Sequence, residues 1–91
     1  GKSCVCKNIV VYCMKNRKGS NRIGITCGKA VGKAVTRNRA KRLVRESYRL
    51  MEAELPLGFD FVIVVRARAV GKKLDDISSD MHYAMRKLSL I

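Results

Sequence analysis

Apolar residues alternate with a period of two in three stretches of the chain and recur at helical spacing in two others. This pattern predicts strands over residues 3–15, 22–28 and 59–67, and helices over residues 36–55 and from Asp75 to near the last residue. The order strand, strand, helix, strand, helix is typical of a layered α+β domain. A length of 91 residues fits a single domain.

The first predicted strand is apolar on both faces, which favours a central strand or one that is covered on both sides. One face carries Ile9, Val11 and Cys13, and the other carries Val10, Tyr12 and Met14. Residues 16–21 have turn composition, so we expect a hairpin loop that leads into the second strand. In the second and third strands the core positions are Ile23, Ile25, Cys27, Phe61, Ile63 and Val65.

The first helix is expected to begin with Thr36 as its N-cap and to end before Pro56 and Gly58. Its apolar arc, which we expect to pack on the sheet, comprises Ala40, Leu43, Val44, Tyr48 and Met51. Asp75 and Asp76 stand at the start of the second helix, where negative charge favours the helix dipole. The buried face of that helix should comprise Ile77, Met81, Ala84, Met85 and Leu88.

The net charge of +13 is concentrated in the first 49 residues. Residues 1–28 carry six basic and no acidic residues, residues 29–49 carry eight basic residues against Glu46 alone, and residues 50–91 are balanced. A solubilising surface would spread its charge, whereas a site for a polyanion concentrates it.

Within the first helix, Arg37, Lys41, Arg45 and Arg49 follow one another at i, i+4, and Arg42 lies beside them. Like charges at this spacing repel, and phosphate groups relieve the repulsion. The alternative is pairing with acids, of Glu46 with Arg42 and of Glu52 with its neighbours, but two acids cannot neutralise five cations. About six phosphate contacts predict a slope of roughly −4 to −5 for log affinity against log salt. The residues alone therefore predict nucleic-acid binding without separating RNA from DNA.

Protein-borne catalysis and metal binding are not indicated. The spacing of Cys4, Cys6, Cys13 and Cys27 differs from that of structural zinc sites, so we interpret them as reduced thiols. His82 is the only histidine, and a lone histidine is more often a packing residue than an acid–base catalyst. No apolar run is long enough for a membrane span, and no signal peptide is visible.

The sequence resembles the bacterial ribonuclease P protein component. The resemblance rests on Val31-Gly32-Lys33-Ala34-Val35 followed by an R-N-x-x-K-R-x-x-R-E pattern over residues 37–46. Gly1-Lys2-Ser3, Tyr12 and the Leu55-Pro56-x-Gly58-Phe59-Asp60 segment also match. Gly28 and Ala30 stand where the family usually has Ser and Lys, and the family's usual N-terminal helix has no counterpart in residues 1–91.

The resemblance implies an α-β sandwich of the ribosomal protein S5 domain 2 type with a left-handed β-α-β crossover. It also implies an accessory subunit that helps a catalytic RNA to remove the 5′ leader from precursor tRNA. The catalytic RNA would be contacted by Arg37, Asn38, Arg39, Lys41, Arg42, Arg45 and Arg49. The leader would be contacted by Tyr12, Lys29 and Lys33. No residue of the chain would be catalytic or bind metal, and Mg²⁺ would act with the RNA.

Some alternatives stay open at this point. Asn38 could instead cap backbone groups, and Tyr12 could be buried packing. A ribosomal or chaperone-type RNA-binding module would use the same basic helix, and a membrane-active basic protein is a third class. We expect a monomeric, cytoplasmic protein.

Overall fold

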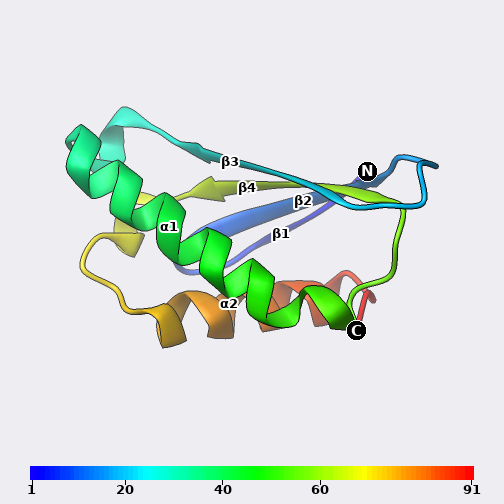
Figure 1. The fold of residues 1–91 in the computed structure, drawn as a ribbon. Helices are drawn as coiled ribbons and strands as arrows, with labels where there is room; N and C mark the ends of the chain where they lie inside the picture. Colours follow the sequence, from blue (N-terminus) through cyan, green and yellow to red (C-terminus); the bar gives the residue numbers. More distant parts are fainter.

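The protein has two layers, a four-stranded sheet and a pair of helices that lie on one face of it (Figure 1). The computed structural model describes residues 1–91. The strands are β1 (Lys2–Val5), β2 (Ile9–Lys15), β3 (Arg22–Cys27) and β4 (Phe59–Val65), in the spatial order β1-β2-β4-β3. The helices are α1 (Ala34–Met51) and α2 (Leu74–Lys87), and the predicted α+β class is confirmed.

The prediction of one strand over residues 3–15 was wrong, because the chain reverses at residues 6–8 and forms two antiparallel strands, β1 and β2. The Cys6 N–H donates to the carbonyl of Ile9 at 2.8 Å, which closes the turn. The Asn8 N–H donates to the Asp80 carboxylate at 2.8 Å, which ties the turn to α2. Asp80 on α2, which is distant in sequence, therefore fixes this turn. The alternation of apolar residues on either side of the turn gives no sign of it.

The predicted hairpin between β2 and β3 was also wrong. β4 lies between them, antiparallel to β2 and parallel to β3, so residues 16–21 cross over the end of β4. The Asn16 side chain donates to the Asp60 carboxylate at 2.8 Å, and Asn21 accepts from the Phe59 N–H at 2.9 Å. In this central place the backbone of β4 pairs with a strand on each edge. A strand that is apolar on both faces suits such a place. The β3–α1–β4 crossover is left-handed, as the family resemblance implied (Figure 1).

The core lies between the sheet and the two helices. The predicted arc of α1 is confirmed, with Ala40, Val44, Tyr48 and Met51 buried, Leu43 partly buried and Ser47 added. All five predicted positions on α2 are buried. The opposite face of the sheet is not covered, since the side chains of Tyr12, Met14 and Val62 are 46%, 55% and 38% exposed. β2 is thus a central strand with one open face.

α1 begins two residues earlier than predicted. Lys33 is the N-cap residue and no side chain caps the helix, so the expected role of Thr36 was wrong. The 3-10 turn η1 (Lys29–Val31) leads to Gly32, whose φ of 123° is strained for any residue with a side chain. That turn sets the entry angle of α1, and the helix then continues through Met51 into the 3-10 turn η2 (Glu52–Glu54).

Asp60 makes a bidentate ion pair with Arg22 at 2.7 and 2.9 Å on the open face of the sheet. The hydrogen bonds from Arg22 and then Asn16 hold the pKa of Asp60 far below its usual range. Since the folded-state pKa is lowered, the pair stabilises the protein above the unfolded-state pKa, about 3.9. That contribution is lost as the pH falls from there through the folded-state pKa.

We therefore expect the pH dependence of stability below about pH 4 to flatten in Asp60→Asn. Urea unfolding between about pH 2 and pH 6 measures this. Asp75→Asn is the control, because the Asp75 carboxylate accepts no hydrogen bond from the rest of the protein. If the unfolding free energy fell equally steeply below about pH 4 in wild type and in Asp60→Asn, the role given to this pair would be contradicted.

Candidate nucleic-acid interface

The cationic face of α1 is open to solvent. Arg39, Arg42, Arg45 and Arg49 are exposed, and Lys41 is half-exposed. These positions follow one another around the side of the helix away from the buried arc, because successive residues turn by about 100°. The face is therefore available to a polyanion along about three turns of helix.

The protein's own acids leave most of this charge unpaired. Glu46 pairs with Arg49 at 3.4 Å, and not with Arg42 as the alternative required, while Glu52 makes no ion pair. An exposed pair of this kind is worth about 0–1 kcal/mol. Lys41, Arg42 and Arg45 have no carboxylate within ion-pair distance. The explanation by internal neutralisation is thus excluded.

Arg37 differs from the other cations. Its position on the helix turns towards the buried arc, so its side chain is half-buried, and its Nε is buried without a hydrogen-bond partner. An unsatisfied buried donor costs about 1–3 kcal/mol. Arg37 therefore presents less of its guanidinium group to a ligand than Arg42 or Arg45 does.

The start of α1 gathers further donors. No acidic residue lies in its first turn and no side chain occupies its free backbone N–H groups, while Lys29 and Lys33 are exposed just before it. Asn38 is exposed and its carboxamide makes no hydrogen bond within the protein, so the capping interpretation was wrong. Free N–H groups, the helix dipole and two lysines together suit a phosphate group.

Tyr12 lies in the middle of the open sheet face, so burial in the core is excluded. The strand register puts it in a row across all four strands, in which the other members are Ser3, Val62 and Gly24. A side chain at Gly24 would meet only the Phe61 carbonyl oxygen, at 4.0 Å. The ring therefore lies between Ser3 and Val62, with Gly24 beyond Val62, and a planar group can reach it.

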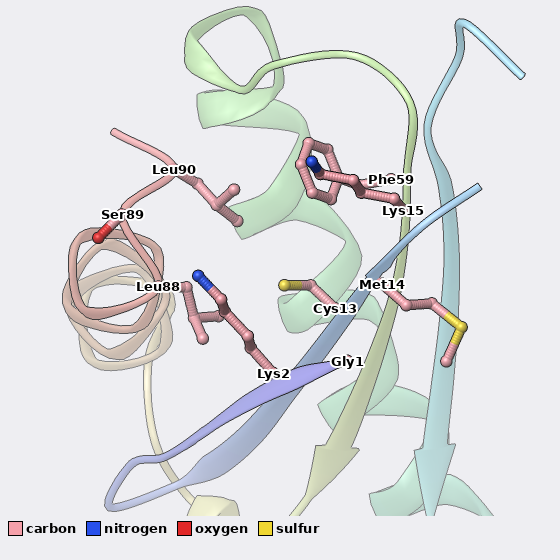
Figure 2. A pocket seen from close by; sticks show the side chains of 9 residues that line it. All are labelled: Gly1, Lys2, Cys13, Met14, Lys15, Phe59, Leu88, Ser89 and Leu90. Atoms are coloured by element: carbon pink, nitrogen blue, oxygen red, sulfur yellow. The ribbon is translucent and has the colours of Figure 1, made fainter. Parts of the chain in front are cut away.

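A hollow of about 430 Å³ lies at the end of β1 and β2 beside the last turn of α2 (Figure 2). Cys13, Leu88 and Leu90 point towards its interior, whereas Met14 points away. Its charged lining residues are Lys2 and Lys15, with no carboxylate or histidine. This lining therefore lacks the histidine that acid–base catalysis uses most often, and it also has no carboxylate.

The cysteines and the histidine take structural places. All four cysteines are free thiols, and burial, followed by the charges of Cys4 and Asp80, raises the pKa of Cys6 to about 12. His82 donates from Nδ1 to the Ser78 carbonyl at 2.9 Å, and its Nε2 lies 3.8 Å from Glu54. No helix combines the length and the apolar character that crossing a membrane requires.

A second basic segment follows β4, and the sequence shows it as a basic loop over residues 68–74. Residues 66–73 carry four cations and no acid, although residues 50–91 are neutral as a whole. Arg39 donates from Nη1 to the Lys72 carbonyl at 3.3 Å, so this segment lies against α1.

The whole chain matches a known family. The family model described as Ribonuclease P matches residues 1–89. The chain belongs to the ribonuclease P protein family. It is 44% identical over 93 residues to the "Ribonuclease P protein component" of Clostridium acetobutylicum, with 100% of this chain and 78% of the relative covered. The relative of the same name from Lachnoclostridium phytofermentans is 48% identical over 85 residues, with 92% and 73% covered.

Solved structures of the family share the fold. The RNase P protein from Staphylococcus aureus superposes with a TM-score of 0.86 at 26% identity, covering 99% of this chain and 83% of that one. The RNase P protein from Thermotoga maritima gives 0.82 at 31% identity, covering 91% and 79%. The chain is thus the accessory subunit of an endoribonuclease, and the resemblance read from the R-N-x-x-K-R-x-x-R-E pattern is confirmed.

Proposed function

We propose that this ribonuclease P subunit binds the catalytic RNA of the enzyme through the exposed cations of α1. The observation that carries the proposal is that Lys41, Arg42 and Arg45 lie on one open face with no carboxylate within ion-pair distance. Guanidinium groups bind phosphate oxygens bidentately, and the pairing relieves their mutual repulsion. Arg39 and Arg49 would extend the contact, with Arg37 and Asn38 at its edge.

The second part of the proposal concerns the substrate. We infer that the 5′ leader of precursor tRNA lies on the open sheet face, with an unpaired base on Tyr12 and phosphates near Lys29 and Lys33. The exposure of the Tyr12 side chain, 46%, in a row with Ser3, Val62 and Gly24 supports this assignment, since it leaves the ring accessible. The side chains of Tyr12, Lys29 and Lys33 are all exposed.

Chemistry at the scissile phosphate would belong to the RNA and its Mg²⁺ ions. The protein offers positioning and charge neutralisation, which strengthen binding of the substrate and of the metal ions that the RNA holds. Its only histidine is engaged by Ser78, and no group of three or more His, Cys, Asp or Glu side chains is placed to hold a metal ion. A cytoplasmic site of action accords with this role.

Reconstitution tests the proposal. The protein is added to a bacterial ribonuclease P RNA at low Mg²⁺, and release of the 5′ leader from precursor tRNA is followed. We expect the protein to raise the cleavage rate strongly at low Mg²⁺ and little at high Mg²⁺, where the metal screens the RNA alone. RNA binding without any stimulation would contradict the proposed role of this surface in leader removal.

Tyr12→Ala should weaken binding of precursor tRNA to the reconstituted enzyme about tenfold, because the stack of one base is lost. Tyr12→Phe keeps the ring and should restore the wild-type affinity. Mature tRNA has no leader, so its affinity should not change in either variant. Equal losses for precursor and mature tRNA would show that Tyr12 does not contact the leader.

A further inference from the structure

A groove on the outer side of α2 takes no part in the surfaces described so far. It consists of two hollows, of about 440 and 210 Å³, that share Lys7, Ser79 and Asp80. The larger hollow is bordered by Val5 and Tyr83, and the smaller one is lined by polar residues alone, including Arg68 and Lys72. We call the two together the α2 groove.

Three part-buried hydrogen bonds hold the α2 groove in shape. Asp80 on α2 accepts from the Asn8 N–H at 2.8 Å and, through its carbonyl, from the Cys6 thiol at 3.5 Å. Arg66 donates from Nη1 to the Cys6 carbonyl at 2.6 Å. The β1–β2 turn is therefore fixed against α2 and β4, and a ligand would find the groove already formed.

The polar hollow has unpaired positive charge. Lys7, Arg68 and Lys72 are exposed and make no ion pair, although two carboxylates lie in the same hollow. Those carboxylates are engaged by backbone groups, Asp80 by the Asn8 N–H and Asp76 by the Lys73 N–H at 3.0 Å. The three cations outnumber the two carboxylates, so the hollow keeps an excess of positive charge, which suits a phosphate group.

The neighbouring hollow offers an aromatic and apolar surface. The Tyr83 side chain is 46% exposed and Val5 is 66% exposed, and the Lys87 Nζ lies 5.7 Å from the centroid of the Tyr83 ring. An exposed ring beside a cationic hollow is the arrangement that binds an unpaired base next to its own phosphate. The combination points to a nucleotide rather than to a peptide or a free anion.

The α2 groove is continuous with the cationic face of α1. The Arg39 guanidinium reaches across to the Lys72 carbonyl, so the two basic surfaces meet at this contact. An RNA that lies along α1 can therefore extend over Arg39 to Lys72 and Arg68. The occupant that fits is a strand of the same RNA.

We propose that the α2 groove binds one unpaired nucleotide of the RNA that α1 holds, with its base on Tyr83 and its phosphate between Lys7, Arg68 and Lys72. This inference rests on the proposed function, since it assigns a further contact to the same partner. It makes the protein's RNA-binding surface wrap around the Arg39–Lys72 contact instead of ending at the edge of α1.

The test measures affinity for a bacterial ribonuclease P RNA across a salt series. Tyr83→Ala should weaken binding about tenfold with an unchanged salt slope, and Tyr83→Phe should bind like wild type. Arg68→Ala with Lys72→Ala should lower the steepness of the slope by about 0.7, the share of one phosphate on an unpaired strand. Lys15→Ala with Lys18→Ala is the charge-matched control at the other end of β2, and circular dichroism checks that each variant is folded.

The three ways of failing are distinguishable. If the groove variants bind as the control does while Arg42→Ala and Arg45→Ala weaken binding, the nucleotide site is overturned and the role of α1 stands. If Tyr83→Phe loses as much affinity as Tyr83→Ala, the aromatic half of the site is overturned. If the α1 variants are also without effect, both the groove and the proposed function are overturned.

Discussion

Arg42→Ala combined with Arg45→Ala should reduce the affinity for ribonuclease P RNA about a hundredfold while leaving the fold intact. Both side chains are exposed and without ion pairs, so their removal takes away phosphate contacts and no packing. Each charged hydrogen bond to phosphate is worth about 1.5–3 kcal/mol, and a tenfold change corresponds to about 1.4 kcal/mol. The salt slope should become shallower by about 1.5.

The matched control is Arg17→Ala with Arg86→Ala, which removes the same charge from exposed positions away from α1. It should change the affinity only slightly, through the general electrostatic field. Circular dichroism and urea unfolding monitor the fold of both double variants. Unfolding of Arg42→Ala at room temperature, or a control that binds as weakly as the α1 variant, would show that the exposed face has been assigned wrongly.

Phe61→Ala should cost about 3–5 kcal/mol of unfolding free energy. Phe61 is 1% exposed at the centre of β4, and its ring lies 5.9 Å from the ring of Tyr48 on α1 and 6.1 Å from that of Phe59. Small domains have total stabilities of about 5–15 kcal/mol, so the variant should be close to unfolding at 37 °C. Urea unfolding measures the loss.

Val62→Ala is the control for Phe61, because Val62 is the next residue of the same strand and faces the open side of the sheet, 38% exposed. It should cost less than about 1 kcal/mol. Its affinity for ribonuclease P RNA should equal that of the wild type, since α1 is untouched. A loss at Val62 as large as that at Phe61 would contradict the assignment of one buried and one open face.

Periodicity in the sequence predicted the parts of the fold that depend on local pattern. The buried face of α2 and the alternation along β4 follow from spacing alone, because the side chains that share a face are near neighbours in sequence. Likewise the cations of α1 could be placed on one face, since 3.6 residues complete each turn. The family pattern over residues 37–46 supplied the specific function that this charge alone could not.

What escaped prediction depends on partners far apart in the chain. The β1–β2 turn is fixed by Asp80, more than 70 residues away, and the place of β4 between β2 and β3 rests on backbone pairing with two strands that lie far before it in the sequence. The start of α1 depends on the left-handed backbone of Gly32 rather than on the hydroxyl of Thr36. The contact between Arg39 and Lys72 likewise exists only in the folded protein, so the continuity of the two basic surfaces could not be seen beforehand.

Arginine modification by phenylglyoxal, mapped by mass spectrometry with and without ribonuclease P RNA, probes the α1 interface in the unaltered protein. Arg39, Arg42 and Arg45 should be protected when the RNA is bound, while Arg17 and Arg86 stay reactive. Arginines of α1 that react equally fast in the complex and in the free protein would contradict the assignment of this helix to the RNA.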